Sequence, residues 1–263
     1  MPSAAFRFYA ELNDFLPAAR QFTEFTHPFL DIATVKDFIE SFGVPHTEVD
    51  LVLVNGEPVE FSYRVKDGDR VSVYPMFESF DIAPVSRVRP EPLRTPRFIL
   101  DTHLGRLAAF LRMLGFDCLY RNCYTDEQLA STSRDERRIL LTRDVGLLKR
   151  GAVTHGYFVR ETDPKRQLCE IVCRFDLVRL ARPFTRCMRC NTPLQEVSKA
   201  EVLAELPPRT AEEHNEFRRC PTCRRVYWKG AHYRRMMGLV PGSEAQPAES
   251  QTDGSGRSYT ESK

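Results

Sequence analysis

From residue 97 to residue 182 the chain repeats one pattern, in which a short apolar segment is followed by a helical one. The apolar segments read RFILD, FDCLY, RRILLT and GYFVR. In the first helical segment, THLGRLAAFLRMLG, the apolar residues recur at helical spacing and Gly115 ends the helix. Strand–helix units of this length predict a parallel sheet with helices on its faces. In such a sheet ligands bind beyond the carboxyl ends of the strands.

The helical segments carry recognisable start signals. Thr125 is placed to cap the helix that begins at TDEQLASTS, and Gln128 completes a capping box. The last helix is expected to begin at Pro164 and to continue through KRQLCEIVCRFDLVRL, with Val178 among its inward-facing residues.

Residues 4–80 have a different pattern, that of a compact α+β unit. A strand (AAFRFYA) is followed by a helix (ATVKDFIESFGV) that Thr34 caps, and then by two short strands around Asn55-Gly56 and a last strand after DGDRV. This order resembles the ubiquitin-like β-grasp fold, and the sulfur-carrier branch in particular. Sulfur carriers end in a free Gly-Gly, whereas this strand continues into FESFDIAPVSR and a long further chain. Sulfur carriage is therefore excluded, and a docking or regulatory module remains.

Acidic residues follow the predicted strands of the central region. Asp101 comes directly after RFIL, Asp144 just after RRILLT and Asp163 shortly after GYFVR, while Asp126 opens the helix after the second strand. Clustered carboxylates repel one another unless a divalent cation compensates them, and hard oxygen ligands suit Mg²⁺ or Mn²⁺. Asp126 and Asp163 have an alternative interpretation as helix-start residues, since each stands where a helix begins. Asp101 and Asp144 are the stronger site candidates.

These residues also carry a family resemblance. The segments FILDTHLGRLAAFLRMLGFD, TDEQL and RRILLTRDVGLLKR, followed by a Cys-x-x-Cys ribbon, resemble the mutator-seven C-terminal RNase family, a PIN-like nuclease group whose bacterial members often carry an N-terminal ubiquitin-like domain. The resemblance implies a metal-dependent ribonuclease with Asp101, Asp126 and Asp144 as its acidic constellation. Asp163 would take the place of the fourth acid.

Basic residues lie on the same elements as the acids. Arg106, Arg143, Lys149 and Arg150 belong to the helices and turns that follow the predicted strands, where they are candidates for holding RNA phosphates. Arg143, next to Asp144, is the best of them. For the other three, a role as solvated helix charges is an equal alternative.

Eight cysteines are present, and four of them form two Cys-x-x-Cys pairs: Cys187 with Cys190, and Cys220 with Cys223. Two such pairs on facing turns are typical of a closed tetrahedral zinc site with a structural role. We interpret the other four cysteines as small core or surface residues.

The segment after the second cysteine pair, RRVYWKGAHYRRM, interleaves basic and aromatic residues. Basic side chains can contact phosphates while aromatic rings stack on unpaired bases. The alternative is that Tyr227, Trp228 and Tyr233 pack the ribbon against its neighbour, with Arg224, Arg225, Lys229, Arg234 and Arg235 as solvated charges.

These observations predict an α+β ubiquitin-like β-grasp domain followed by an α/β PIN-like parallel-sheet domain and a small zinc ribbon. The expected boundaries are 1–84 for the first domain, 85–96 for a Pro-rich linker, 97–182 for the RNase domain, 183–238 for the ribbon and 239–263 for a disordered tail with few apolar residues. No stretch is apolar enough to span a membrane, and the charged start lacks a signal sequence, so a cytoplasmic protein is expected.

Charge divides unevenly along the chain. Residues 1–88 carry 7 basic and 14 acidic side chains, whereas residues 89–182 carry 18 and 12. The basic middle of the chain suits a polyanion. Together with the acids at the strand ends, the family resemblance implies a metal-dependent endoribonuclease with RNA as its substrate and a protein partner for the ubiquitin-like domain. The sequence further predicts that the acidic first domain rests against the basic rim of the second and competes with RNA. The alternatives are a catalytically silent RNA-binding adaptor and a protein-docking scaffold.

Overall fold

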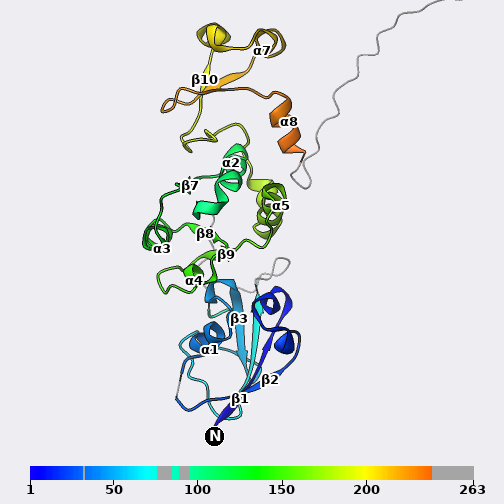
Figure 1. Cartoon of the computed structure of the whole chain (residues 1–263), viewed down its shortest axis with the longest axis vertical. Coiled ribbons are helices and arrows are strands. Elements are labelled where there is room, and N and C mark those ends of the chain that lie inside the picture. Colours follow the sequence, from blue (N-terminus) through cyan, green and yellow to red (C-terminus); the bar gives the residue numbers. More distant parts are fainter. Residues whose placement is uncertain (32, 76–84, 89–94, 239–263) are drawn as a thin grey trace, which may run out of the picture.

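The computed structural model describes residues 1–31, 33–75, 85–88 and 95–238. The expected tail, 239–263, lies outside the described residues. Three modules follow one another along the long axis of the molecule: an N-terminal domain, a central domain and a cysteine ribbon (Figure 1).

The N-terminal domain is a five-stranded mixed sheet with one helix across it. Its elements are β1 (Ser3–Phe8), β2 (Phe25–Pro28), α1 (Val35–Ser41), β3 (Val49–Val54), β4 (Glu57–Pro58) and β5 (Arg70–Pro75). The strand order is β2-β1-β5-β3-β4, with β1 and β5 parallel and the other neighbours antiparallel. Apolar side chains from α1 and from alternate positions of β1 and β5 form one buried core. This arrangement confirms the predicted β-grasp fold.

One strand of this domain was not predicted, and one predicted helix start is confirmed. Strand β2 was not predicted, because its residues are half-buried or exposed and show no apolar run. Thr34 caps α1 as expected, and Asp37 completes a capping box by accepting a hydrogen bond from the Thr34 N–H at 2.9 Å.

Part of the expected linker packs on this domain. Val88 is buried in the N-terminal core, and the Ser86 hydroxyl donates a hydrogen bond to the Asp50 carbonyl at 2.6 Å. The described residues 85–88 therefore extend the first domain, and a linker remains a prediction for the positions around them.

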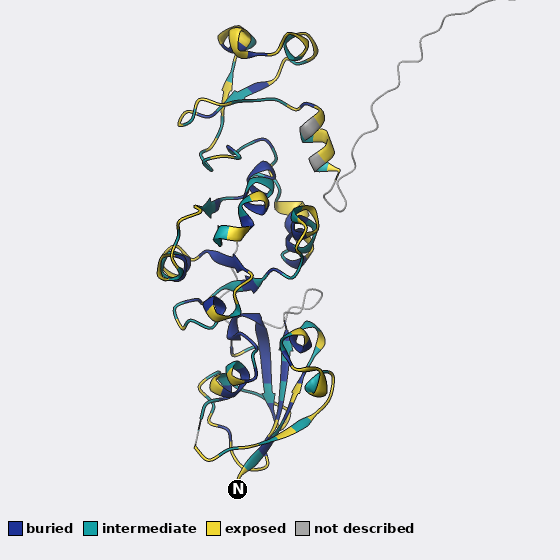
Figure 2. Ribbon diagram, viewed as in Figure 1, coloured by how far each residue is buried: buried dark blue, intermediate teal, exposed yellow. Residues whose placement is uncertain are grey.

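The central domain is a four-stranded, all-parallel sheet, as predicted. Its elements are β6 (Phe98–Leu100), α2 (Gly105–Met113), β7 (Cys118–Tyr120), α3 (Asp126–Asp135), β8 (Ile139–Thr142), α4 (Val145–Leu148), β9 (Gly156–Phe158) and α5 (Pro164–Arg174). The order is β7-β6-β8-β9. Helices α2 and α5 pack on one face of the sheet and α3 and α4 on the other, so that β6 and β8 are buried on both sides (Figure 2).

The final helix is shorter than the sequence pattern indicates. Helix α5 ends at Arg174, and Asp176 adopts a left-handed conformation with φ of 44° before a short 3-10 helix from Leu177 to Leu180. Val178, which an unbroken helix would turn inward, is 36% exposed. The helical spacing of apolar residues continues past Arg174, although the backbone ends the helix there.

The N-terminal domain covers one open edge of the central sheet. Val159 donates its N–H to Thr142 on β8, so the preceding residue, Phe158, turns its main-chain groups to the open side of β9. The Glu48 carboxylate accepts the Phe158 N–H at 2.6 Å, and Arg160 donates to the Phe158 carbonyl at 3.1 Å. An exposed strand edge is thereby closed by side chains.

Glu48 itself is buried and charge-paired at this junction. It has no solvent exposure, and its Oε2 contacts the Arg160 Nη2 at 3.2 Å. Burial raises the pKa of Glu48 above its usual value, although Arg160, the Phe158 N–H and Arg174 oppose that shift.

Further contacts join the same two domains. The His46 Nε2 donates to the Val153 carbonyl at 2.9 Å, and the Lys149 ammonium donates to the Glu40 carbonyl at 2.7 Å. The Phe15 ring lies edge-on to the Phe158 ring, with centroids 5.4 Å apart. Arg160 also contacts Asp14 at 3.2 Å, and Arg174 contacts Glu11 at 3.6 Å. Acidic side chains of the first domain thus meet basic side chains of the second.

The ribbon contains the remaining elements: β10 (Gln195–Val197), α6 (Lys199–Val202), α7 (Pro208–Glu213), β11 (Phe217–Arg219), β12 (Val226–Tyr227) and α8 (Ala231–Met237). Its sheet is antiparallel in the order β10-β11-β12. A small core around Val202, Leu206 and Phe217 holds α6 and α7 against it.

The ribbon covers the other edge of the central sheet. Cys118 on β7 turns its main-chain groups outward; its N–H donates to the Asn191 Oδ1 at 3.1 Å, and its carbonyl accepts from the Arg112 Nη2 at 2.7 Å. The same guanidinium reaches the carbonyls of Met188 and Arg189 in the first cysteine turn, at 3.2 and 2.8 Å. Both edges of the sheet are therefore closed by a neighbouring module.

Candidate functional site

Two of the predicted acids lie at the carboxyl ends of the adjacent strands β6 and β8, and Thr142 connects them. The Thr142 hydroxyl donates to the Asp101 Oδ2 at 2.7 Å and accepts from the Asp144 N–H at 2.9 Å. The Asp101 Oδ1 accepts from the Thr102 N–H at 2.5 Å. The Asp144 Oδ1 accepts from the N–H groups of Gly146 and Leu147, at 2.7 and 3.3 Å. We call Asp101, Thr142 and Asp144 the acid edge.

Thr142 was not among the predicted site residues. It is fully buried at the end of β8, and its hydroxyl uses both a donor and an acceptor bond to set the positions of the two acids. A threonine that ends an apolar strand one residue before Arg143-Asp144 gives no distinctive sequence signal. Its role emerges only when β6 and β8 are placed side by side.

The other two predicted acids form no hydrogen bond with this pair in the described structure and have partners of their own. Asp126, at the start of α3, contacts the Arg150 Nη2 at 3.3 Å. Asp163 caps α5 by accepting from the N–H groups of Lys165 and Arg166, at 3.0 and 3.1 Å. Within the described part of the chain, the four ribbon cysteines are the only group of three or more potential metal ligands whose ligating atoms lie close together. Membership of Asp126 and Asp163 in the metal site stays a prediction.

Three of the four predicted RNA-contacting basic residues have partners within the protein. The Arg143 Nη1 donates to the carbonyls of Val159, Arg160 and Glu161, at 2.7–2.8 Å, which holds the turn after β9. Lys149 donates to the N-terminal domain, as described above, and Arg150 pairs with Asp126 and Glu127.

Arg106 is exposed in the first turn of α2, which follows Asp101. Helix α2 begins four residues after Asp101. Of the four predicted phosphate contacts, Arg106 is thus the one for which the described residues supply no partner within the protein.

The four predicted metal-binding cysteines come together in the ribbon. Their sulfur atoms all lie within 4.8 Å of one another, with Cys187 to Cys223 at 3.5 Å and Cys190 to Cys220 at 3.4 Å. A zinc ion bound by four sulfurs at about 2.3 Å would set them about 3.8 Å apart. The cluster therefore has the donor set and the dimensions to hold a metal ion.

Neighbouring groups bond to these sulfurs. The Tyr227 hydroxyl lies 3.1 Å from the Cys187 Sγ, and the Cys223 N–H donates to the Cys220 Sγ at 3.4 Å. Burial opposes ionisation of the Cys190 thiol, but hydrogen bonds from Thr192 and from adjacent thiols lower its pKa to about 6. Tyr227, considered above as an RNA contact, therefore lies against the cysteine cluster.

Comparison with known protein families agrees with both folds. The profile of the Mut7-C RNAse domain matches residues 96–240, and that of the Mut7-C ubiquitin domain matches residues 1–81. The chain belongs to the Mut7-C RNAse domain family. The resemblance inferred from the sequence is thus confirmed, and the family description indicates a nuclease-like domain.

Among solved structures, the chain is similar to small archaeal modifier protein 1 of H. volcanii, at 17% identity over 29% of this chain and 100% of that chain, with a TM-score of 0.24. A second structure, SAMP1 from Haloferax volcanii, matches at 18% identity over 30% of this chain and 99% of that chain, with the same TM-score. No curated protein matches the Mut7-C chain. Among its described helices, none has the length and apolar character that crossing a membrane requires.

Proposed function

We propose that this Mut7-C protein is a metal-dependent endoribonuclease that cleaves at the acid edge. The observation that supports this most is the pair of carboxylates at the ends of β6 and β8, held in place by the Thr142 hydroxyl, in a domain of this family. Carboxylate oxygens suit Mg²⁺ or Mn²⁺, and Asp101 and Asp144 are the residues that would hold such an ion. When bound, the ion would activate water and stabilise negative charge on the phosphate.

The protein groups around the acids have roles that follow from their bonds. Thr142 and the Thr102 N–H keep the Asp101 carboxylate oriented, while the start of α4 holds one oxygen of Asp144. Fixed carboxylates lose little conformational freedom on binding a metal. Arg106 would hold the RNA backbone near the acids.

The cysteine cluster would bind one structural Zn²⁺. Four thiolates leave no open coordination position for substrate, as in structural zinc sites generally. Because Arg112 ties the first cysteine turn to β7, metal binding would stabilise the nuclease domain as well as the ribbon.

A second candidate, an RNA-binding adaptor without turnover, is favoured by one observation. Asp126 is engaged by Arg150, and no third carboxylate joins Asp101 and Asp144 in the described residues. Release of Asp126 from Arg150 would be needed to complete a three-acid site.

Cleavage assays separate the two candidates. The full chain should cut single-stranded RNA with Mn²⁺ or Mg²⁺, and the Asp101→Asn/Asp144→Asn chain should bind RNA without cutting it. Asp135→Asn is the matched control, because Asp135 is exposed at the end of α3 and, within the described part of the chain, forms an ion pair with its neighbour Arg134 alone. Salt-sensitive binding by the unmodified chain without metal-dependent cleavage would establish the adaptor instead.

A further inference from the structure

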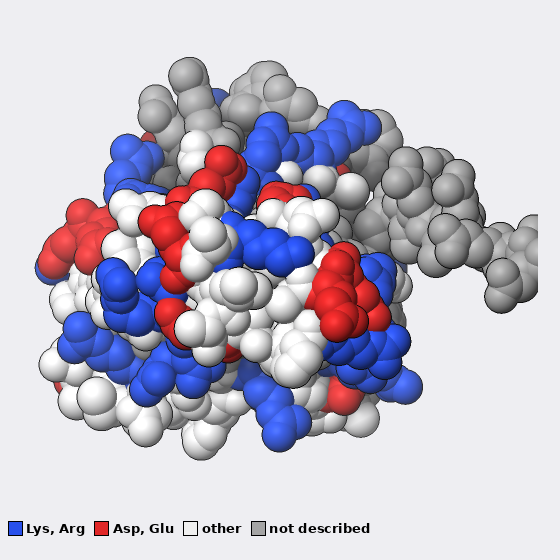
Figure 3. Space-filling model, turned by 90° about the horizontal axis from the view of Figure 1, so that it is seen from above, with Lys and Arg blue, Asp and Glu red and all other residues white. Residues whose placement is uncertain are grey.

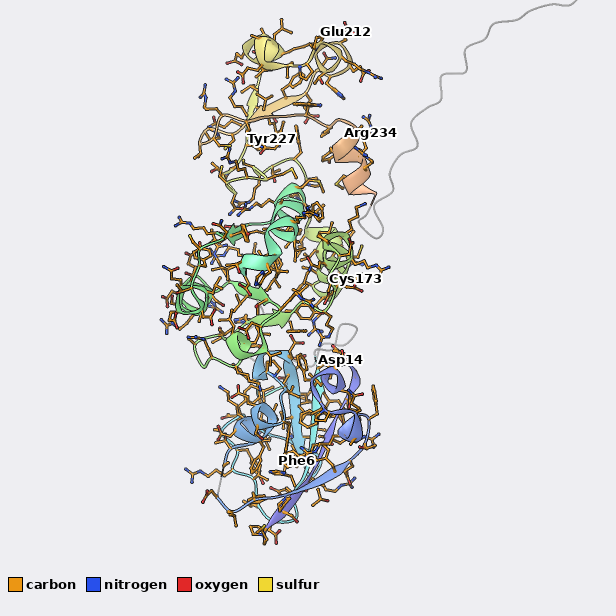
Figure 4. The ribbon with its side chains drawn as sticks, in the orientation of Figure 1. Phe6, Asp14, Cys173, Glu212, Tyr227 and Arg234 are labelled. Atoms are coloured by element: carbon orange, nitrogen blue, oxygen red, sulfur yellow. The ribbon has the colours of Figure 1, made fainter. Side chains whose placement is uncertain are left out.

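A cavity lies where the ribbon, helix α8 and the end of α2 meet. Its volume is about 400 Å³, within the usual range for small-molecule sites. Four of its eleven lining residues are aromatic, namely Phe184, Tyr227, Trp228 and Tyr233, and no acidic residue lines it. Figure 4 labels Tyr227 on the ribbon and Arg234 on the neighbouring helix α8.

Basic groups surround the aromatic lining. The Arg218 guanidinium lies 5.0 Å from the centre of the Phe184 ring, and the Lys229 ammonium lies 5.4 Å from it. Arg186 lines the cavity itself. Arg218 and Lys229 also pair with the exposed Glu196 and Glu216. The Lys229–Glu216 pair is about half exposed, and ion pairs of this kind contribute little stability, so a phosphate can compete for Lys229.

Seen from the ribbon end, the surface shows basic and acidic side chains with uncharged areas between them (Figure 3). Charge alone therefore does not define a binding face here. What distinguishes the cavity is the combination of flat aromatic walls with adjacent cations.

We propose that this cavity binds one unstacked nucleobase of the RNA, with the flanking phosphates on Arg186 and Lys229. A base offers a flat ring to stack on aromatic side chains, and its attached phosphates carry the charge that the cations complement. An apolar peptide side chain would use the aromatic walls but would bring no negative charge to the cations beside them. The inference rests on the proposed function, since it requires RNA as the ligand.

The cavity is remote from the acid edge. Asp101 lies just before α2, whereas Met113, which lines the cavity, is the last residue of that helix. Nine helical residues span about 13 Å. The base in the cavity is therefore not one that flanks the cut, and the site would position the RNA rather than take part in the chemistry.

Trp228 supplies a direct probe, because it is the only tryptophan in the chain. Single-stranded RNA is titrated into the zinc-loaded Asp101→Asn/Asp144→Asn chain while tryptophan emission is recorded. We expect binding to change the emission. A set of oligonucleotides, each with one abasic position, should show one position whose base contributes roughly 5- to 100-fold in affinity.

A variant of the cavity wall completes the test. Tyr233→Leu should lower affinity for the intact oligonucleotide by a similar factor and have no effect on the oligonucleotide abasic at the sensitive position. Tyr74→Leu, in the N-terminal domain, is the control and should change neither. Tyr227 is left intact because its hydroxyl contacts Cys187.

Two outcomes would overturn the inference. Unchanged emission on RNA binding, or equal affinity for all abasic oligonucleotides, would show that the cavity does not take a base, while metal-dependent cleavage by the unmodified chain would still uphold the proposed function. If no RNA binds at all, both the base site and the proposed ribonuclease are wrong.

Discussion

Replacing Glu48 tests whether the ubiquitin-like domain is a structural part of the nuclease domain. In Glu48→Ala, the Phe158 N–H on the edge of β9 loses its acceptor and Arg160 loses a buried partner. Removing one member of a buried pair destabilises by about 3–5 kcal/mol, and the lower end of that range is expected here because Arg160 keeps its contact with Asp14. For the ubiquitin-like and nuclease domains unfolding together, this loss of free energy corresponds to a fall in melting temperature of roughly 6–20 °C.

Two measurements check this prediction. Differential scanning calorimetry should show the loss of stability in the transition of the nuclease domain, and hydrogen exchange should show faster exchange of the Phe158 amide. Glu57→Ala is the matched control, because Glu57 is an exposed glutamate on β4 of the same domain.

The reasoning fails if Glu48→Ala behaves like Glu57→Ala, with a change in unfolding free energy below about 0.5 kcal/mol. It also fails if only a separate transition of the ubiquitin-like domain shifts. Either result would mean that the two domains are tethered and that the edge of β9 is stable without its cover.

Three further predictions concern the acid edge, the cysteines and pH. Thr142→Val should lower metal affinity or cleavage by about 10- to 100-fold while Thr142→Ser, which keeps the hydroxyl, retains most of the activity; a kinetic titration with Mn²⁺ measures both. Elemental analysis should find about one zinc per chain. The Cys187→Ser/Cys220→Ser chain should lose the zinc and unfold at a lower temperature. A metal-free double variant of unchanged stability would exclude a structural zinc site. Burial holds the pKa of Glu48 above its ordinary value of 4.5. The neutral carboxyl therefore contributes stability below pH 4.5, and this contribution is lost as the pH rises through the raised pKa. Denaturant unfolding from pH 4 to pH 8 should therefore show the unmodified chain losing stability relative to Glu48→Gln, and a constant difference would refute the raised pKa.

Local patterns predicted the fold well because each is decided by nearby residues. The capping box at Thr125 and Gln128 and the order of strands and helices follow from side chains within a few positions. The end of α5 at Arg174 did not follow, since the apolar spacing continues past the left-handed Asp176. Breaks of this kind depend on backbone geometry that composition does not reveal.

The individual residues that join the modules could not be predicted from the sequence. Glu48 is an ordinary glutamate in the sequence, and only the docked structure shows it accepting an N–H from β9. The same holds for Lys149, which the sequence places beside the nuclease site and the structure bonds to the Glu40 carbonyl. Acidic side chains of the first domain do meet Arg160 and Arg174 of the second, through Asp14, Glu48 and Glu11, whereas competition with RNA stays a prediction.

The most direct test of the central claim uses RNA in which the nucleotide before the cut carries a 2′-deoxy sugar. If water is the attacking group at a metal held by Asp101 and Asp144, the ribose 2′-hydroxyl is not needed for cleavage. The unmodified chain should then cut this substrate with Mn²⁺, and the Asp101→Asn/Asp144→Asn chain should not. Cleavage that requires the 2′-hydroxyl, or that persists in the double variant, would contradict a metal-dependent hydrolysis at the acid edge.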